Sequence, residues 1–543
     1  MKKLSGTSYG WQLSSLLISA LIAVPMVFII ISLFSGADPA WTHLKETILP
    51  SYIGNTVLLM AQVALYSTII GVSTAWLTAA TQFPGRQFFS WALMLPLAAP
   101  AYIVAYVYTD LLDFSGPVQT AFRAITGYEA GDYMFPQIRS LTGAALMLSL
   151  VLYPYVYMLA RASFVQRSAT LFDAARTLGA RPLKAFFKIA LPAARPAIAA
   201  GLALVLMETL ADFGVVEYFG VPTFSTGIFR TWFAMGEKMA AMKLAAVMFI
   251  IVAFLVVLEK WSRKGTTQSA HARDAAMNRA PLKGMQAFGA VLICALPVLL
   301  GCVIPLAVLG NLAITVGDPK LGYDFSDFTI NSVSVAGMAV GVALIAALML
   351  TYAQRIAPTK TTAGAIQIST LGYALPGAML AIGLLAPLSQ LDRWLAEFFE
   401  TTFDWRSGLL LTGTVTTLVY AYVVRFLTVA YNTTSSGLEQ IPPIYDQAAR
   451  SLGAKPFRLV KEIHFPLMQR SVVAAGILIF VDTMRELPAT LLLRPFNFET
   501  LATRVYRLAG DERLAEASTA AIAIVLIGLI PVLTLNKLTD RKH

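Results

Sequence analysis

Charged residues stand at two matching places inside long apolar stretches of this sequence. Glu208 and Asp212 are four residues apart in one stretch, a spacing that puts both on one face of a helix. The other stretch holds Asp482, Arg485 and Glu486 at helical spacing. Arg485 could pair with the acids and join helices, or the carboxylates could line a path for a cation, since charges at membrane depth usually face the interior of a bundle. The sequence leaves both alternatives open and indicates no fixed metal site.

Sequence patterns for ATP binding and metal binding do not accompany these residues. A phosphate-binding loop needs Gly-Lys followed by Ser or Thr, and the dipeptide Gly-Lys does not occur. The four histidines and two cysteines lack the spacing of metal ligands. We therefore expect no catalytic residues, no enzymatic activity and no cofactor in this chain.

The elements that carry these charges are expected to cross a membrane. Hydrophobic residues make up 57% of the chain and charged residues 13%, with a mean hydropathy of +0.68. Each apolar run of 18 or more residues is long enough to cross about 30 Å of hydrocarbon as a helix. The composition predicts an all-α polytopic membrane protein with about twelve spans, two of them holding the charges. The spans are roughly 11–34, 55–80, 90–110, 141–163, 196–216, 240–258, 286–313, 330–353, 366–388, 409–431, 472–493 and 515–536.

Basic residues set the predicted orientation. Lys and Arg gather in 161–195, 259–284 and 432–470, which all fall on one side of the twelve-span model. The positive-inside rule makes that side cytoplasmic and puts both termini there. The loop 494–514 disagrees, because it is basic and predicted outside. The net charge of +11 is thus a signal of topology, and we expect contact with membrane lipid rather than with nucleic acid.

A polar loop occurs twice in the sequence. Asp173-Ala-Ala-Arg-Thr-Leu-Gly179 runs on to Ile189-Ala-Leu-Pro192, and Gln447-Ala-Ala-Arg-Ser-Leu-Gly453 runs on to Ile463-His-Phe-Pro466, an offset of 274. The pairs Asn55 and Asn331, and Pro100 and Pro376, match at an offset of 276. Six spans separate equivalent points, so the repeat is expected to be parallel, with both loops on one side. The expected parts are a first helix and loop (1–50), a first transmembrane domain (51–260), a linker with an extra helix (261–329) and a second transmembrane domain (330–537).

Each loop predicts a helix–turn–helix that faces a partner protein. Residues 169–178 favour a short helix with Thr170 as a possible N-cap, and Gly179 suits a left-handed turn. Pro182 then suits the start of a second short helix that ends before Pro192. The second copy repeats this plan, with Gly453 at the turn. Two such loops would present two matching surfaces.

The loops resemble the EAA loop of ABC importer permeases, which is Glu-Ala-Ala, three residues, Gly, nine residues and Ile-x-Leu-Pro. Asp173 and Gln447 stand where the family has its leading Glu, and Asp446 precedes Gln447. The resemblance covers about 55–260 and 330–537 and implies the type I importer permease fold, with two permeases fused in one chain. It also implies that the loops seat in a cytoplasmic ABC ATPase dimer, which holds the ATP. The residues that this implies for coupling are Asp173, Ala174, Ala175, Gly179, Gln447, Ala448, Ala449 and Gly453.

The segments that begin at Glu208 and Arg485 resemble one particular group of these permeases. They are similar to the fused permeases of bacterial iron(III) importers of the inner membrane, which work with a periplasmic substrate-binding protein and an ATPase dimer. Permeases for thiamine, polyamines or oxyanions share the fold and the loop and remain alternatives. A transporter driven by an ion gradient is the alternative from another class, and the duplicated loop disfavours it because such a carrier has no ATPase to contact.

Overall fold

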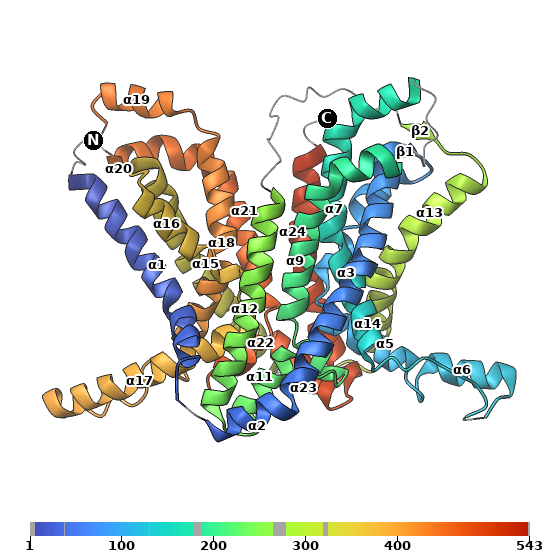
Figure 1. Cartoon of the computed structure of the whole chain (residues 1–543), viewed down its shortest axis with the longest axis horizontal. Coiled ribbons are helices and arrows are strands. Elements are labelled where there is room, and N and C mark those ends of the chain that lie inside the picture. Colours follow the sequence, from blue (N-terminus) through green and yellow to red (C-terminus); the bar gives the residue numbers. More distant parts are fainter. Residues whose placement is uncertain are drawn as a thin grey trace. The chain divides into compact units, whose positions relative to one another are not determined.

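The computed structural model describes residues 6–36, 38–129, 131–177, 186–263, 279–318, 324–454 and 456–540. Helices make up nearly all of this part of the chain (Figure 1). The strands found within it are the parallel two-residue pair β1 (Thr81–Gln82) and β2 (Ala280–Pro281). The predicted helical fold class is confirmed.

The helices of the first half are α1 (Gly6–Ser32), α2 (Pro39–Thr47), α3 (Leu49–Ala80), α4 (Arg86–Ala92), η1 (Leu95–Ala98), α5 (Ala101–Leu112), α6 (Pro117–Thr126), α7 (Leu141–Thr177), η2 (Phe186–Ala190), α9 (Leu191–Ala211), α10 (Gly214–Tyr218), α11 (Phe224–Phe233) and α12 (Lys238–Arg263). Those of the second half are α13 (Met285–Val298), η3 (Leu299–Val303), α14 (Ile304–Thr315), α15 (Asp324–Ile356), α16 (Lys360–Ser369), η4 (Gly372–Ala374), α17 (Gly377–Phe403), α18 (Val415–Glu439), α19 (Pro443–Ser451), α20 (Pro456–Leu459), η5 (Val460–His464), α21 (Phe465–Met484), α22 (Pro488–Leu493), α23 (Leu501–Gly510) and α24 (Leu514–Asp540).

Among the described residues, 9 helices are long and apolar enough to cross a membrane, or up to 11 if each of two bent pairs is one span. The predicted third and ninth spans are these pairs, bent by 89° and 117°. The bends fall at Pro100 and Pro376, which cap α5 and α17. The residue before a proline avoids the helical region, and Ala99 is extended. The predicted tenth span falls on α18, which is too polar to be one of these 9 helices.

Structure as well as sequence repeats along the chain. A five-residue π-helix leads into α9 and into α21 at the same register, since η2 begins at Phe186 and η5 begins 274 residues later at Val460. The two matched asparagines make matched hydrogen bonds. Nδ2 of Asn55 donates to the carbonyl of Pro222 at 3.0 Å, and Nδ2 of Asn331 donates to that of Glu499 at 3.1 Å. The repeat predicted from the sequence is therefore confirmed in local structure.

The chain forms two compact units that interleave along the sequence. Unit 1 contains the described residues of Met1–Asp38, Lys238–Ala246 and Lys320–Arg504. Unit 2 contains those of Pro39–Glu237, Val247–Pro319 and Val505–His543. In unit 1, α1 packs against α15, α16 and α17 of the second half. In unit 2, α14 and α24 pack against α5 of the first half. Each core of long helices is thus completed by helices from the other half of the sequence.

Contacts inside unit 1 put three segments predicted to be cytoplasmic at one end of the helices. Nε2 of Gln12, near the start of α1, donates to Oγ1 of Thr359, just before α16, at 3.0 Å. The ring of Trp11 contacts Tyr352, near the end of α15. In Figure 1, α19 and α20 lie at this same end of the unit. The arrangement agrees with the topology predicted for these segments.

The basic loop 494–514 has internal partners for its charges. Nη1 of Arg494 lies 3.5 Å from Oε1 of Glu499. Arg504 is buried with its guanidinium 5.2 Å from the ring centre of Phe328. Nη2 of Arg513 lies 2.5 Å from Oε2 of Glu516. With these partners, the three arginines of the loop do not contradict the predicted topology.

Candidate functional site

The second repeated loop forms a helix, a glycine turn and a second short helix. Gln447, Ala448 and Ala449 lie in α19, and α20 follows from Pro456. Gly453 has φ +78, the left-handed conformation that the sequence predicted, because glycine adopts it without a Cβ clash. The amide of Ala454 donates to the carbonyl of Ala449 at 3.0 Å and closes the end of α19. Instead of ending before Pro466, as expected, α20 runs through η5 into α21.

Large apolar side chains are exposed along one face of α19. Ile444, Tyr445 and Leu452 have 66%, 49% and 88% of their surface exposed, and Ala448 lies exposed among them on the same face. Ala449 is buried, and Gln447 is exposed. We call Ile444, Tyr445, Ala448 and Leu452 the apolar stripe. A polar loop that exposes such a stripe has the character of a docking surface for another protein.

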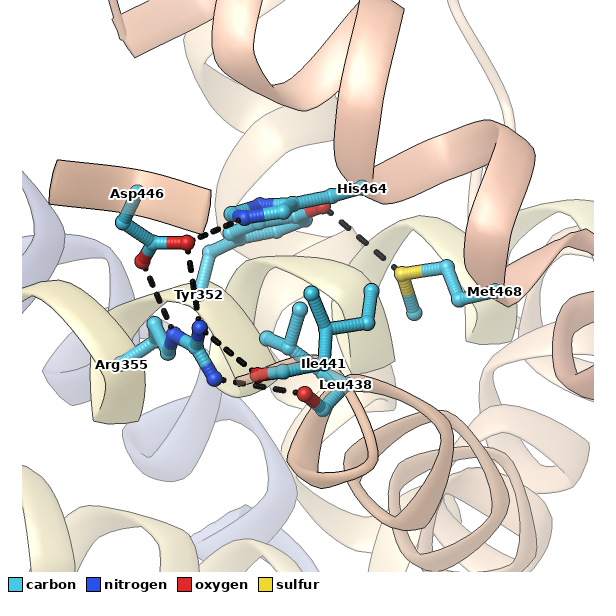
Figure 2. Close-up of polar contacts among 7 residues, drawn as sticks. All are labelled: Tyr352, Arg355, Leu438, Ile441, Asp446, His464 and Met468. Carbon is cyan, nitrogen blue, oxygen red and sulfur yellow. Dashed lines mark hydrogen bonds and ion pairs between the residues drawn. The ribbon is translucent and has the colours of Figure 1, made fainter. Parts of the chain in front are cut away.

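A polar cluster holds the buried side of α19 (Figure 2). Oδ2 of Asp446 accepts from Nε of Arg355 at 3.1 Å, and Oδ1 accepts from Nη2 of the same guanidinium at 3.1 Å. Nε2 of His464 donates to Oδ1 of Asp446 at 2.8 Å, because an ionised carboxylate can only accept. Arg355 also donates to the carbonyls of Leu438 and Ile441 at 3.3 and 3.0 Å. The end of α15 is thereby joined to both ends of the turn that leads into α19.

The environment of Asp446 favours its charged form. Burial by itself would raise the pKa of this carboxyl, but the hydrogen bonds from Arg355 and His464 and the charge of the guanidinium outweigh it. The pKa therefore lies below its usual range. The ring of Tyr352 stacks on His464, with centroids 5.7 Å apart, and covers the cluster. We call Arg355, Asp446 and His464 the loop brace.

The first repeated loop is described only in part. Asp173, Ala174 and Ala175 lie in the last turns of α7, and Gly179 lies outside the described residues. The expectation of a separate short helix capped by Thr170 is wrong, because α7 continues without a break from the fourth span to Thr177. After the gap, η2 leads into α9 as η5 leads into α21.

Aromatic packing stands near the first loop where the second has its brace. The ring of Trp76 lies 4.9 Å from Phe186 and 5.4 Å from Phe164, centroid to centroid. Ala190 occupies the position equivalent to His464. The described residues beside the first loop are thus packed through aromatic rings, whereas an ionic brace holds the second loop.

The acids of the eleventh span have two different arginine partners. Nη2 of Arg485 lies 2.5 Å from Oδ1 of Asp482, whereas Oε1 of Glu486 lies 2.9 Å from Nη1 of Arg425 in α18. Arg485 pairs with Asp482, as one alternative expected, and Glu486 also has a partner outside its own helix. The reason is that α21 ends at Met484, so Glu486 leaves the helical spacing and turns to α18. The pairing with Arg425 could not be found from the sequence, because this arginine lies 61 residues away on another helix.

The acids of the fifth span are also separated by a helix end. Glu208 lies in α9, but Asp212 follows the last residue of that helix with an extended backbone, so the expected shared helix face is not formed. Oδ1 of Asp212 accepts from the amides of Val215 and Val216 at 3.1 and 3.2 Å and so caps α10. Asp212 is the repeat equivalent of Glu486, and Glu208 that of Asp482. Each repeat thus places an acid at the same break between two helices.

The chain contains two copies of one arrangement of bent membrane spans, and its second repeated loop exposes an apolar surface. These features are typical of a membrane permease whose two halves are fused in one chain. A family model for the binding-protein-dependent transport system inner membrane component matches residues 67–259 and again 366–542. The chain belongs to this family of ABC importer permeases, and it is a membrane component without catalytic function. Members of the family work with ATPase and binding-protein partners.

Several known proteins are similar over most of the chain or over one half of it. The Fe(3+)-transport system permease protein FbpB 2 of Haemophilus influenzae is 26% identical over 497 residues, which cover 89% of this chain and 89% of the relative. The ferric transport system permease protein FbpB of Actinobacillus pleuropneumoniae is 22% identical over 554 residues, 95% of this chain and 76% of the relative. A putative 2-aminoethylphosphonate transport system permease protein, PhnV, of Salmonella typhimurium is 24% identical over 215 residues, 40% of this chain and 75% of the relative.

Proposed function

We propose that this permease carries iron(III), delivered by a periplasmic binding protein, across the bacterial inner membrane. The choice of iron(III) as substrate is supported by relatives named for ferric transport. These relatives match along both halves of the chain, over 89% and 95% of it. The relative named for 2-aminoethylphosphonate matches 40% of it. Permeases of this kind for thiamine, a polyamine or an oxyanion are the alternatives.

A separate pair of ATPase subunits drives this transport from the cytoplasm, where both termini lie. The apolar stripe of α19 supports one docking surface, and the repeated residues Asp173, Ala174, Ala175 and Gly179 support the second. The loop brace supports the coupling role of the second loop. Because it fixes α19 to α15, a movement of the ATPase against α19 can be transmitted to a transmembrane helix.

Glu208 and Asp212 are the pathway residues of the proposal, and Asp482, Arg485 and Glu486 are structural. Ion pairs with Arg485 and Arg425 support the structural role of the second set. Carboxylate oxygens are hard ligands that suit a hard cation such as iron(III).

Uptake by reconstituted vesicles tests the proposal. The permease is inserted with its ATPase, supplied with the binding protein, and offered radiolabelled iron(III), thiamine, a polyamine, sulfate and 2-aminoethylphosphonate. We expect ATP-dependent uptake of iron(III) alone. Uptake of another substrate in its place contradicts the substrate, and uptake without the ATPase contradicts the class.

A charge-only change tests the pathway residues. Glu208→Gln/Asp212→Asn keeps the shape of both side chains, and Asn retains the Oδ1 that caps α10, so we expect normal yield with sharply lower iron uptake. The matched control is the repeat-equivalent Asp482→Asn/Glu486→Gln, which leaves two arginines without their carboxylates and should lower the yield. Full iron uptake by the first double variant would refute the pathway role.

A further inference from the structure

Two helices of this chain hold a polar side chain inside their own unit and leave large apolar side chains uncovered along one face. They are α6 and residues 390–403 of α17, which we call the α17 end. The two correspond at the repeat offset of 276, so that Phe122 of α6 matches Phe398 of the α17 end. Neither helix belongs to the coupling loops or to the charged breaks described above.

Asp392 fixes the α17 end to unit 1. Asp392 is fully buried, and its Oδ1 accepts from the amides of Leu410 and Leu411 at 3.1 and 2.8 Å. Its Oδ2 accepts from the amide and the hydroxyl of Thr412 at 2.6 and 2.5 Å. The carboxylate thus fastens the helix to the segment that leads into α18.

The opposite side of the α17 end carries large apolar groups. Leu391, Trp394 and Phe398 follow one another at helical spacing and have 43%, 60% and 43% of their surface exposed. Exposed charged residues occupy the neighbouring face of the helix, at Arg393, Glu397 and Glu400. Figure 1 shows this part of α17 extending beyond α1, away from the other helices of unit 1.

The first repeat builds the same arrangement with other residues. Nε2 of Gln119 donates to the carbonyl of Leu112 at 2.9 Å, and the hydroxyl of Tyr133 donates to Oε1 of Gln119 at 2.8 Å. Nη1 of Arg123 donates to the same hydroxyl at 2.8 Å. The polar side of α6 is therefore occupied by its own unit, while Ile125 is 84% exposed. Val118 and Phe122, on the same side, are 41% and 38% exposed.

We propose that α6 and the α17 end lie in the boundary between lipid headgroups and acyl chains, where their apolar sides are covered by the bilayer. A helix of a soluble protein buries its apolar side, whereas a helix that lies in this boundary leaves its apolar side to the lipid and its polar side to water. Trp, Tyr and Phe facing outward are typical of that boundary, where one part of the ring is apolar and the other wet.

The position of α17 supports the bilayer as the occupant. A Cβ at Gly383 would lie 2.9 Å from the carbonyl oxygen of Pro25, so α17 crosses directly over α1. The helix α1 is long and apolar enough to cross a membrane, and it exposes Ile30 and Ile31 within two turns of this crossing. The α17 end begins about two turns after the same crossing, so it starts beside a spanning helix. Because both repeats meet the bilayer, it also explains why an uncovered apolar face occurs in each.

Fluorescence quenching in vesicles tests the proposal on the full chain. Single cysteines at Phe398 and Ile125 carry a bimane label, and Glu397→Cys and Thr120→Cys, at exposed polar positions, are the matched controls. Cys294 and Cys302 are buried and do not compete for the reagent. We expect brominated acyl chains to quench the labels at 398 and 125 several-fold more than the controls, and iodide in water to do the opposite.

Three results would overturn the proposal. The first is quenching of the labels at 398 and 125 by iodide and not by brominated lipid. The second is protection from iodide only after the binding protein is added, which would make these surfaces its docking site. The third is protection that grows with the ratio of protein to lipid, which would assign them to contacts between copies of the chain.

Discussion

At the residue scale, Asp446 shows how this permease holds a coupling helix. Its carboxylate makes two hydrogen bonds with Arg355, and their side chains are only 14% and 17% exposed. We predict that Arg355→Ala lowers the free energy of unfolding by about 3 kcal/mol, because it leaves a mostly buried carboxylate without its main partner. The loss of the brace should also reduce the amount of ATPase that co-purifies with the permease. Thermal unfolding in detergent and pull-down with the ATPase measure the two effects.

Arg458 provides a matched control for this change. Its Nε lies 2.9 Å from Oε2 of Glu462 in the same loop region, but the two side chains are 68% and 56% exposed. Such a pair contributes less than about 1 kcal/mol, so Arg458→Ala should change little. If the two arginine variants behaved alike in unfolding and in ATPase binding, the loop brace would have no special role.

The ion pair between Arg425 and Glu486 leads to a second prediction. The Glu486 side chain is 2% exposed, against 20% for Asp482. Arg425→Ala should therefore cost several kcal/mol and lower the yield of folded protein more than Arg485→Ala, since the stranded carboxylate is more deeply buried. Adding Glu486→Gln to Arg425→Ala removes the stranded charge and should restore part of the yield. A greater loss from Arg485→Ala would show that the pair with Asp482 is the more important one.

At the element scale, the turn after α19 can be tested through its backbone. Gly453 has φ +78, and a Cβ there would meet no atom within 4 Å, so any cost of Gly453→Val comes from the backbone alone. We predict a cost of about 1–2 kcal/mol, with weaker ATPase binding and slower transport. Gly408→Val imposes similar strain at φ +65, also without a clash, in a loop predicted on the other side. Normal ATPase binding by Gly453→Val would refute the docking role of this turn.

The elements also show what the sequence could and could not predict. Apolar runs and matched positions such as Asn55 and Asn331 were enough to predict long helices and their repeat, because both depend on local composition and register. The bends at Pro100 and Pro376 were missed since each proline lies inside an apolar run that looks continuous. Arg355 and Asp446 are 91 residues apart along the chain, so only the packing of α15 beside the loop reveals their pairing. The left-handed Gly453 was predictable because the turn itself demands glycine.

At the scale of the whole molecule, topology gives the next prediction. Single cysteines placed in 169–195, 262–282 and 445–470 should react only with a reagent on the cytoplasmic side, and those in 115–138 or 394–406 only with one outside. The physical reason is that the basic segments are held inside by the positive-inside rule. Labelling of 169–195 and 445–470 from opposite sides would contradict a parallel repeat.

The central claim is that one chain presents two docking surfaces to a pair of ATPase subunits. The mass of the complex, measured by native mass spectrometry after mixing the permease with excess ATPase, tests it most directly. We predict one permease chain with two ATPase subunits, and loss of ATPase subunits when Gly179→Val and Gly453→Val are combined. A complex with a single ATPase subunit, or a full complement of two on the double variant, would contradict the claim.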